Sequence, residues 1–270
     1  MPPFLASELG DAFSLSRAHQ IGLVPLIWGA EDPQATLAAY AALYLQEEVQ
    51  AEALVRQIGD FSRFLEVISF SQGSQLNLAA LGREAEIQRK RVESYLAILN
   101  DLLLAFQLPV FQRRAQRQLV QHEKFFFDVG VYRSLRPRGP LDAPEEIEGV
   151  ALESLVAQHL RAFCQLRRRG ETLHFWRTKS GLEVDFVLYG PELFWAIEVK
   201  RRARIERRDL AGQGLKAFGE DYPQAQRWLL SLSPESLLVD GIRCEPLEGW
   251  LRQLHPDHPS PSPIAPHQAR

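Results

Sequence analysis

Hydrophobic positions in the second half of the chain repeat with two different periods. Between residues 182 and 202, two short runs of β-branched, aromatic and aliphatic residues carry few charges, which is typical of buried strands. Residues 147–163 instead place apolar side chains every three or four positions, as one face of a helix does. The pattern predicts a helix followed by two neighbouring strands. Residues 210–218 predict a further helix and residues 227–232 a further strand, so this half is predicted to be α/β.

The first half of the chain is predicted to be mostly helical. A turn-rich opening leads into residues 34–56, a helix-favouring stretch rich in Ala and Leu. Residues 61–111 follow as a helix, a short helix, a third helix and a strand. Ser74 or Asn77 is expected to cap the second of these helices.

Three charged residues interrupt the two predicted strands. Asp185 lies in the first strand, and Glu198 and Lys200 share one side of the second because strand side chains alternate between faces. A charge on a buried strand is costly unless it is paired or bound to a metal. Two carboxylates that converge beside a lysine form a site for a hard cation, which suits phosphodiester hydrolysis.

A third carboxylate, that of Glu153, lies beside the apolar face of the predicted helix. It completes a helix–strand–strand set of acids. A simpler interpretation also exists for each residue. Glu198 and Lys200 then form an ion pair, Asp185 is a strand-end residue that faces solvent, and Glu153 is an ordinary exposed helical glutamate.

Composition sets limits on partners and location. The 270 residues are 46% hydrophobic and 24% charged, as in an ordinary globular protein, and a net charge of −3 gives no overall attraction to nucleic acid. Two cysteines are too few for a disulfide framework, so we expect them to pack in the core of a cytoplasmic protein. The most apolar run, residues 99–111, is too short and too often interrupted to span a membrane.

Local basic patches could still attract a polyanion. The candidates for nucleic-acid binding around the proposed acids are Arg177, Lys179, Arg201 and Arg202, with the run at residues 167–169 close by. A solvated face is the alternative for each of these patches.

The three predicted helices of residues 61–111 suggest a helix-turn-helix, because the third begins with Arg89, Lys90 and Arg91. These side chains are candidate DNA contacts, helped by Arg113, Arg114 and Arg117 in a wing-like hairpin. The alternative is a packing module that binds no DNA.

Several motifs in order resemble one known family. They are Lys124-Phe-Phe-Phe-Asp-Val-Gly-Val-Tyr, the helix start from Gly149 to Glu153, Phe175-Trp-Arg-Thr-Lys-Ser-Gly-Leu-Glu-Val-Asp-Phe-Val and Ala196-Ile-Glu-Val-Lys. Asp185, Glu198 and Lys200 resemble the signature of the PD-(D/E)XK nuclease-like superfamily. The stretch from about residue 124 to 252 resembles more closely the domain of unknown function at the C-terminal end of many prokaryotic AAA-type ATPases.

The resemblance implies a restriction-endonuclease-like mixed sheet flanked by helices, preceded by an all-α, winged-helix domain. Asp185 and Glu198 would hold Mg²⁺ or Mn²⁺, Lys200 would stabilise charge on the scissile phosphate, and Glu153 would support the metal or its waters. The implied parts are a mostly helical remnant of an ATPase region (1–60), a winged-helix-like domain (61–120), the nuclease-like domain (121–254) and a disordered tail (255–270).

Gly-x-x-x-x-Gly-Lys-Ser/Thr, the phosphate-binding loop of this ATPase family, does not occur in the sequence. We therefore expect no ATP hydrolysis by that mechanism. The chain would be a truncated member of the family, a fragment, or the partner of a separate ATPase.

Three functions remain open. The first is Mg²⁺-dependent hydrolysis of DNA, and the second is a non-catalytic module that binds DNA or protein. The third is a structural role, in which residues 1–60 form an interface for an ATPase subunit or for self-association.

Overall fold

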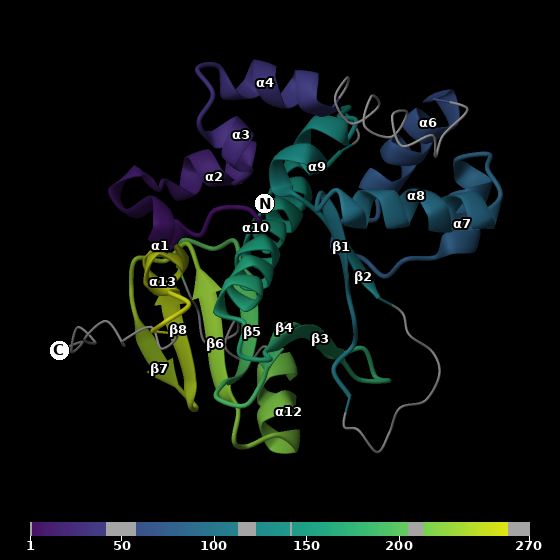
Figure 1. The fold of residues 1–270 in the computed structure, drawn as a ribbon. Helices are drawn as coiled ribbons and strands as arrows, with labels where there is room; N and C mark the ends of the chain where they lie inside the picture. Colours follow the sequence, from purple (N-terminus) through teal and green to yellow (C-terminus); the bar gives the residue numbers. More distant parts are fainter. Residues whose placement is uncertain (1, 42–57, 113–122, 141, 205–212, 259–270) are drawn as a thin grey trace. The chain divides into compact units, whose positions relative to one another are not determined.

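The computed structural model describes residues 2–41, 58–112, 123–140, 142–204 and 213–258. The chain divides into two compact units (Figure 1). Unit 1 consists of Met1–Pro3, Ser16–Gln107 and His122–Leu155, and unit 2 consists of Phe4–Leu15, Leu108–Gln121 and Val156–Arg270. Each unit is described by itself.

The opening of the chain, predicted as a turn-rich start to a mostly helical stretch, folds into short helices. They are α1 (Ala6–Leu9), the 3-10 helix η1 (Gly10–Ala12), α2 (Leu15–Ile21), α3 (Pro25–Trp28) and α4 (Pro33–Ala39). Proline stands at the start of α3 and α4, where a helix needs no N–H, and Asp32 Oδ1 caps α4 by accepting from Ala35 N at 3.0 Å. Helices this short contain too few turns to show a periodic pattern. Residues 42–56 of the predicted long helix lie outside the described residues.

Three helices and a strand follow in the predicted order, and that strand pairs with a second one. They are α6 (Ile58–Ser69), α7 (Leu78–Glu84) and α8 (Arg89–Asp101), then β1 (Ala105–Leu108) paired with β2 (Lys124–Phe127). Asn77 is the cap of α7, since its Oδ1 accepts from Ala80 N at 3.0 Å. Phe61 and Phe64 of α6 pack against Tyr95 of α8 with ring centroids 5.0 and 5.2 Å apart. Arg113, Arg114 and Arg117, expected in a wing, lie outside the described residues.

The buried side-chain amide of Gln72 forms hydrogen bonds with the last residue of β2 in unit 1. Its Nε2 donates to Phe127 O at 3.2 Å and to Ser154 Oγ at 2.8 Å, and its Oε1 accepts from Phe127 N at 2.8 Å. Asp128, directly after β2, then caps α9 (Val129–Leu135) by accepting from Gly130 N at 2.8 Å. The long helix α10 (Pro144–Arg167) contributes to unit 1 as far as Leu155.

Unit 2 is built on a six-stranded mixed sheet, which confirms the α/β prediction. Its strands are β3 (Thr172–Arg177), β4 (Glu183–Tyr189), β5 (Phe194–Lys200), β6 (Gln226–Ser231), β7 (Leu237–Val239) and β8 (Ile242–Pro246). The strand order is β3-β4-β5-β6-β8-β7. Strands β3, β4 and β5 pair antiparallel, β5, β6 and β8 pair parallel, and β7 joins β8 antiparallel.

Helices cover both faces of this sheet (Figure 1). Trp195 of β5 packs against Phe163 of α10, with ring centroids 6.3 Å apart, and against Trp250 of α13 (Leu247–Gln253) at 5.9 Å. Its neighbour Phe194 packs against Phe218 of α12 (Gln213–Asp221) at 5.8 Å. Because neighbouring strand residues point to opposite faces, α10 and α13 cover one face and α12 covers the other.

Gly214 allows the first turn of α12 to lie directly against β4. A Cβ atom at this position would lie 1.9 Å from the carbonyl oxygen of Glu183, so any larger residue would force the helix away from the strand. The helix therefore begins beside the part of β4 that carries Asp185.

Neither cysteine forms a disulfide. Cys244 is fully buried in the sheet and Cys164 is half-buried on α10, and burial raises the pKa of both thiols to about 12. Both therefore act as small packing residues, as predicted. Among the described residues, no helix has the length and hydrophobicity needed to cross a bilayer.

Candidate active site

Asp185 and Glu198 oppose each other on neighbouring strands. The antiparallel register of β4 and β5 pairs Phe186 with Ile197, so the next rung of the ladder places Asp185 opposite Glu198. Directly opposed residues share a face of the sheet, with Cβ atoms about 4.5–5.5 Å apart. In this register Val187 and Ala196 lie on the same face, which is the face that α12 covers. The two candidate acids therefore follow directly on the last paired rung of the two strands.

The carboxylate of Asp185 is held by the main chain of the neighbouring strand. Its Oδ2 accepts a hydrogen bond from Val199 N at 2.8 Å. This bond fixes the orientation of the half-buried side chain and directs it across β5. The simpler interpretation, a strand-end aspartate that only faces solvent, does not describe this contact.

Glu198 and Lys200 form an ion pair. Lys200 Nζ lies 2.7 Å from Glu198 Oε1, as expected for residues two apart on one face of a strand. The Glu198 side chain is 12% exposed and that of Lys200 is 39% exposed. The ion-pair interpretation thus describes a real contact, and it places an ammonium group beside the two acids.

The oxygen donors of Asp185 and Glu198 fit a hard divalent cation. Mg²⁺ prefers carboxylate oxygens and is commonly held by one or two carboxylates while it keeps several waters. Within the described ranges, no group of three or more His, Cys, Asp and Glu side chains is arranged to hold a metal. A pair of carboxylates with water-completed coordination is the arrangement that these residues can offer.

Glu153, the third predicted acid, has a partner inside unit 1. Its Oε1 lies 3.2 Å from Nζ of Lys124, whose side chain is 6% exposed. The contact links α10 to the start of β2. Its predicted support of a metal stays a prediction. Sequence reasoning missed Lys124, although a lysine at the head of a Phe-Phe-Phe strand signals a buried charge that needs an acid.

The predicted basic residues around the two acids are mostly exposed. Lys179, Arg201 and Arg202 lie on the surface, and Arg177 of β3 pairs across the strands with Glu183 of β4 at 3.7 Å. Arg201 and Arg202 directly follow Lys200 in the chain. These cations can therefore meet a polyanion that approaches unit 2.

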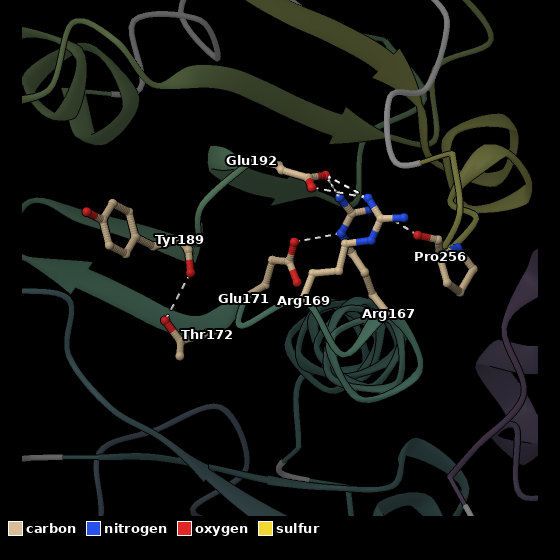
Figure 2. A network of polar contacts seen from close by, with 7 residues as sticks. All are labelled: Arg167, Arg169, Glu171, Thr172, Tyr189, Glu192 and Pro256. Carbon is tan, nitrogen blue, oxygen red and sulfur yellow. Dashed lines mark hydrogen bonds and ion pairs between the residues drawn. The ribbon is translucent and has the colours of Figure 1, made fainter.

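Arg167, expected in a basic patch, is instead buried in a network of polar contacts (Figure 2). Its Nε donates to Glu171 Oε1 at 2.6 Å, its Nη1 donates to Pro256 O at 2.7 Å, and its Nη2 donates to Glu192. The prediction was wrong for this residue. A run of three arginines looks uniformly solvated in sequence, but the last turn of α10 directs the first one inward.

Two of the three basic residues in the first turn of α8 form ion pairs with acids. Arg91 pairs with Asp60 of α6, and Arg89 pairs with Glu93 one turn further along α8 at 3.0 Å. Lys90 is exposed between them. Two of the three predicted DNA contacts are thus engaged with acids of unit 1.

Unit 2 is a mixed-sheet α/β domain with two acids and a lysine on adjacent strands, and one known family model matches most of this region while another matches the first half of the chain. Residues 148–248 match the model of a domain of unknown function (DUF4143), and residues 13–142 match that of another domain of unknown function (DUF8612). The DUF4143 domain is commonly the C-terminal region of AAA-ATPase-associated proteins, which is compatible with the resemblance seen in the motifs. No curated protein and no solved structure matches the chain.

Proposed function

We propose that this protein is a Mg²⁺-dependent hydrolase that cleaves phosphodiester bonds in DNA, with its site on β4 and β5. The observation that carries the proposal is the opposition of Asp185 and Glu198, with the Lys200 ammonium 2.7 Å from one of them. Opposed acids beside an ammonium are costly for packing alone, because each charge loses hydration on a strand. A site that gathers such charges is a functional candidate.

Each residue has a separate task in this proposal. Asp185, oriented by the Val199 amide, and Glu198, held on β5, would bind the cation through carboxylate oxygens. Bound Mg²⁺ would supply a Lewis acid and lower the pKa of an attacking water. Lys200 would donate to a non-bridging phosphate oxygen and stabilise the charge that develops there.

We choose DNA as the substrate because positively charged residues lie close in sequence to the proposed site. Arg177, Lys179, Arg201 and Arg202 are exposed on the segments that flank β4 and β5. Phosphate contacts by such side chains position a nucleic acid without reading its sequence. We therefore expect cleavage with little base preference.

Nicking of supercoiled plasmid tests the proposal. Asp185→Asn keeps an oxygen that can accept from Val199 N but removes the negative charge, so we expect nicking to fall about a hundredfold or more. Glu220→Gln, an exposed acid on α12, is the matched control and should nick like the unmodified protein. Chelator-sensitive cleavage by Asp185→Asn at the normal rate would remove Asp185 from the site.

The second candidate function is a non-catalytic module that binds DNA through unit 1. The specific observation in its favour is the exposed Lys90 at the start of α8, in a set of three helices followed by a two-stranded sheet. Fluorescence anisotropy with a labelled duplex tests it. Lys90→Ala should weaken binding and reduce its salt dependence, and Glu198→Gln should leave binding unchanged.

A further inference from the structure

We infer that Lys200 is a resident counter-charge of Glu198, and that a divalent cation must displace its ammonium group from Glu198 to bind. This inference rests on the proposed function and adds a step of regulation to the same site. It assigns Lys200 a role before the reaction, as a competitor of the metal.

The ion pair and a bound metal compete for the same carboxylate. Lys200 Nζ lies 2.7 Å from Glu198 Oε1, which is hydrogen-bond distance. Mg²⁺ binds carboxylate oxygens at about 2.0–2.1 Å. A cation on this carboxylate would therefore sit within a few ångströms of the ammonium, and the two like charges repel each other.

The two acids are held more firmly than the lysine. Asp185 is bound to the Val199 amide, and Glu198 is 12% exposed within the sheet. Lys200 is the last residue of β5, its side chain is 39% exposed, and its four-carbon stem has several rotatable bonds. When the charges conflict, the ammonium group is the part that moves.

Displacement would change what the site attracts. Without metal, the Lys200 ammonium is engaged with Glu198 and is not directed at a phosphate. A bound divalent cation adds two positive charges beside the acids, and the displaced ammonium can reach a phosphate oxygen. The metal therefore prepares the site for an anionic substrate, because it releases the Lys200 ammonium from Glu198.

Calorimetric titration of Mn²⁺, without nucleic acid, tests the inference directly. Lys200→Met removes the competing charge and keeps much of the side-chain volume, so we expect Mn²⁺ to bind about three- to tenfold more tightly; the half-exposed site keeps the gain modest. Lys200→Arg retains a positive charge and should bind Mn²⁺ like the unmodified protein. Lys216→Met, an exposed lysine on α12, controls for the overall change in charge.

The outcomes separate this inference from the proposed function. If the unmodified protein binds Mn²⁺ and Lys200→Met binds it equally or more weakly, the competition is refuted while the metal site stands. If neither protein takes up Mn²⁺, both the inference and the hydrolase proposal fail. Asp185→Asn should lose the Mn²⁺ signal, which places the bound ion at this site.

Discussion

The backbone amide of Val199 donates to the side chain of Asp185, with 2.8 Å between N and Oδ2. This bond joins β4 to β5 just beyond their paired rungs, which end at Phe186 and Ile197. A side chain thus continues the sheet at the point where the candidate acids lie. Asp185 is consequently both a structural residue and a candidate metal ligand, and its variants must be chosen to separate the two roles.

Asp185→Ala should destabilise unit 2, whereas Asp185→Asn should not. Alanine leaves the half-buried Val199 N–H without its acceptor, which costs about 1–3 kcal/mol, while the asparagine oxygen can still accept. Urea denaturation of both variants measures the difference. An equal loss of unfolding free energy in the two variants would show that the charge, rather than the hydrogen bond, stabilises this end of the strands.

Arg167→Met should be strongly destabilising. The side chains of Arg167 and Glu171 are both fully buried, so the substitution leaves a carboxylate in the interior without its cation. Breaking a buried pair in this way typically costs about 3–5 kcal/mol. Thermal and urea unfolding measure the loss.

A neighbouring arginine provides the matched control for this network (Figure 2). Arg169 pairs with Glu192 at 3.0 Å, but both side chains are about half exposed. Arg169→Met should therefore cost at most about 1 kcal/mol of unfolding free energy.

Adding Glu171→Leu to Arg167→Met should recover stability, because it removes the buried carboxylate that has lost its cation. If stability is not recovered, Arg167 acts mainly through Pro256 and Glu192.

The candidate site was largely predictable from sequence because it depends on strand periodicity. Alternation along β5 already placed Glu198 and Lys200 on one side, and the two apolar runs defined β4 and β5. The opposition of Asp185 and Glu198 needed one more fact, the register, which the turn between the strands fixes. The long helix α10 was equally clear, since its apolar repeat extends over several turns.

Contacts between residues distant in sequence were not predictable. Nothing in the local pattern of Lys124 names Glu153 as its partner, and nothing in the run at residues 167–169 shows which arginine is buried. Both outcomes depend on how α10 packs against strands elsewhere in the chain. Helices α1 to α3 were missed for a different reason: each has at most two turns, so caps and prolines are the only signals. Helix α4 falls within the helix predicted over residues 34–56.

His174 of β3 should make stability depend on pH. Burial lowers the pKa of its ring from the usual 6.5, and the partly buried ring lies edge-to-face against Phe111 with centroids 5.6 Å apart. The unfolded chain therefore binds a proton at a higher pH than the folded chain. The contribution of this ring is complete above about pH 6.5, is lost progressively as the pH falls through the lowered folded-state pKa, and then stays constant.

The measurement compares urea unfolding of the unmodified protein and His174→Gln from about pH 7.5 to about pH 4.5. On acidification, the unfolding free energy of His174→Gln should fall less than that of the unmodified protein, because glutamine takes up no proton. His258→Gln, at an exposed histidine near the end of the described residues, should run parallel to the unmodified protein. Parallel curves for His174→Gln as well would mean that the ring is protonated without penalty and that solvent reaches it between β3 and Phe111.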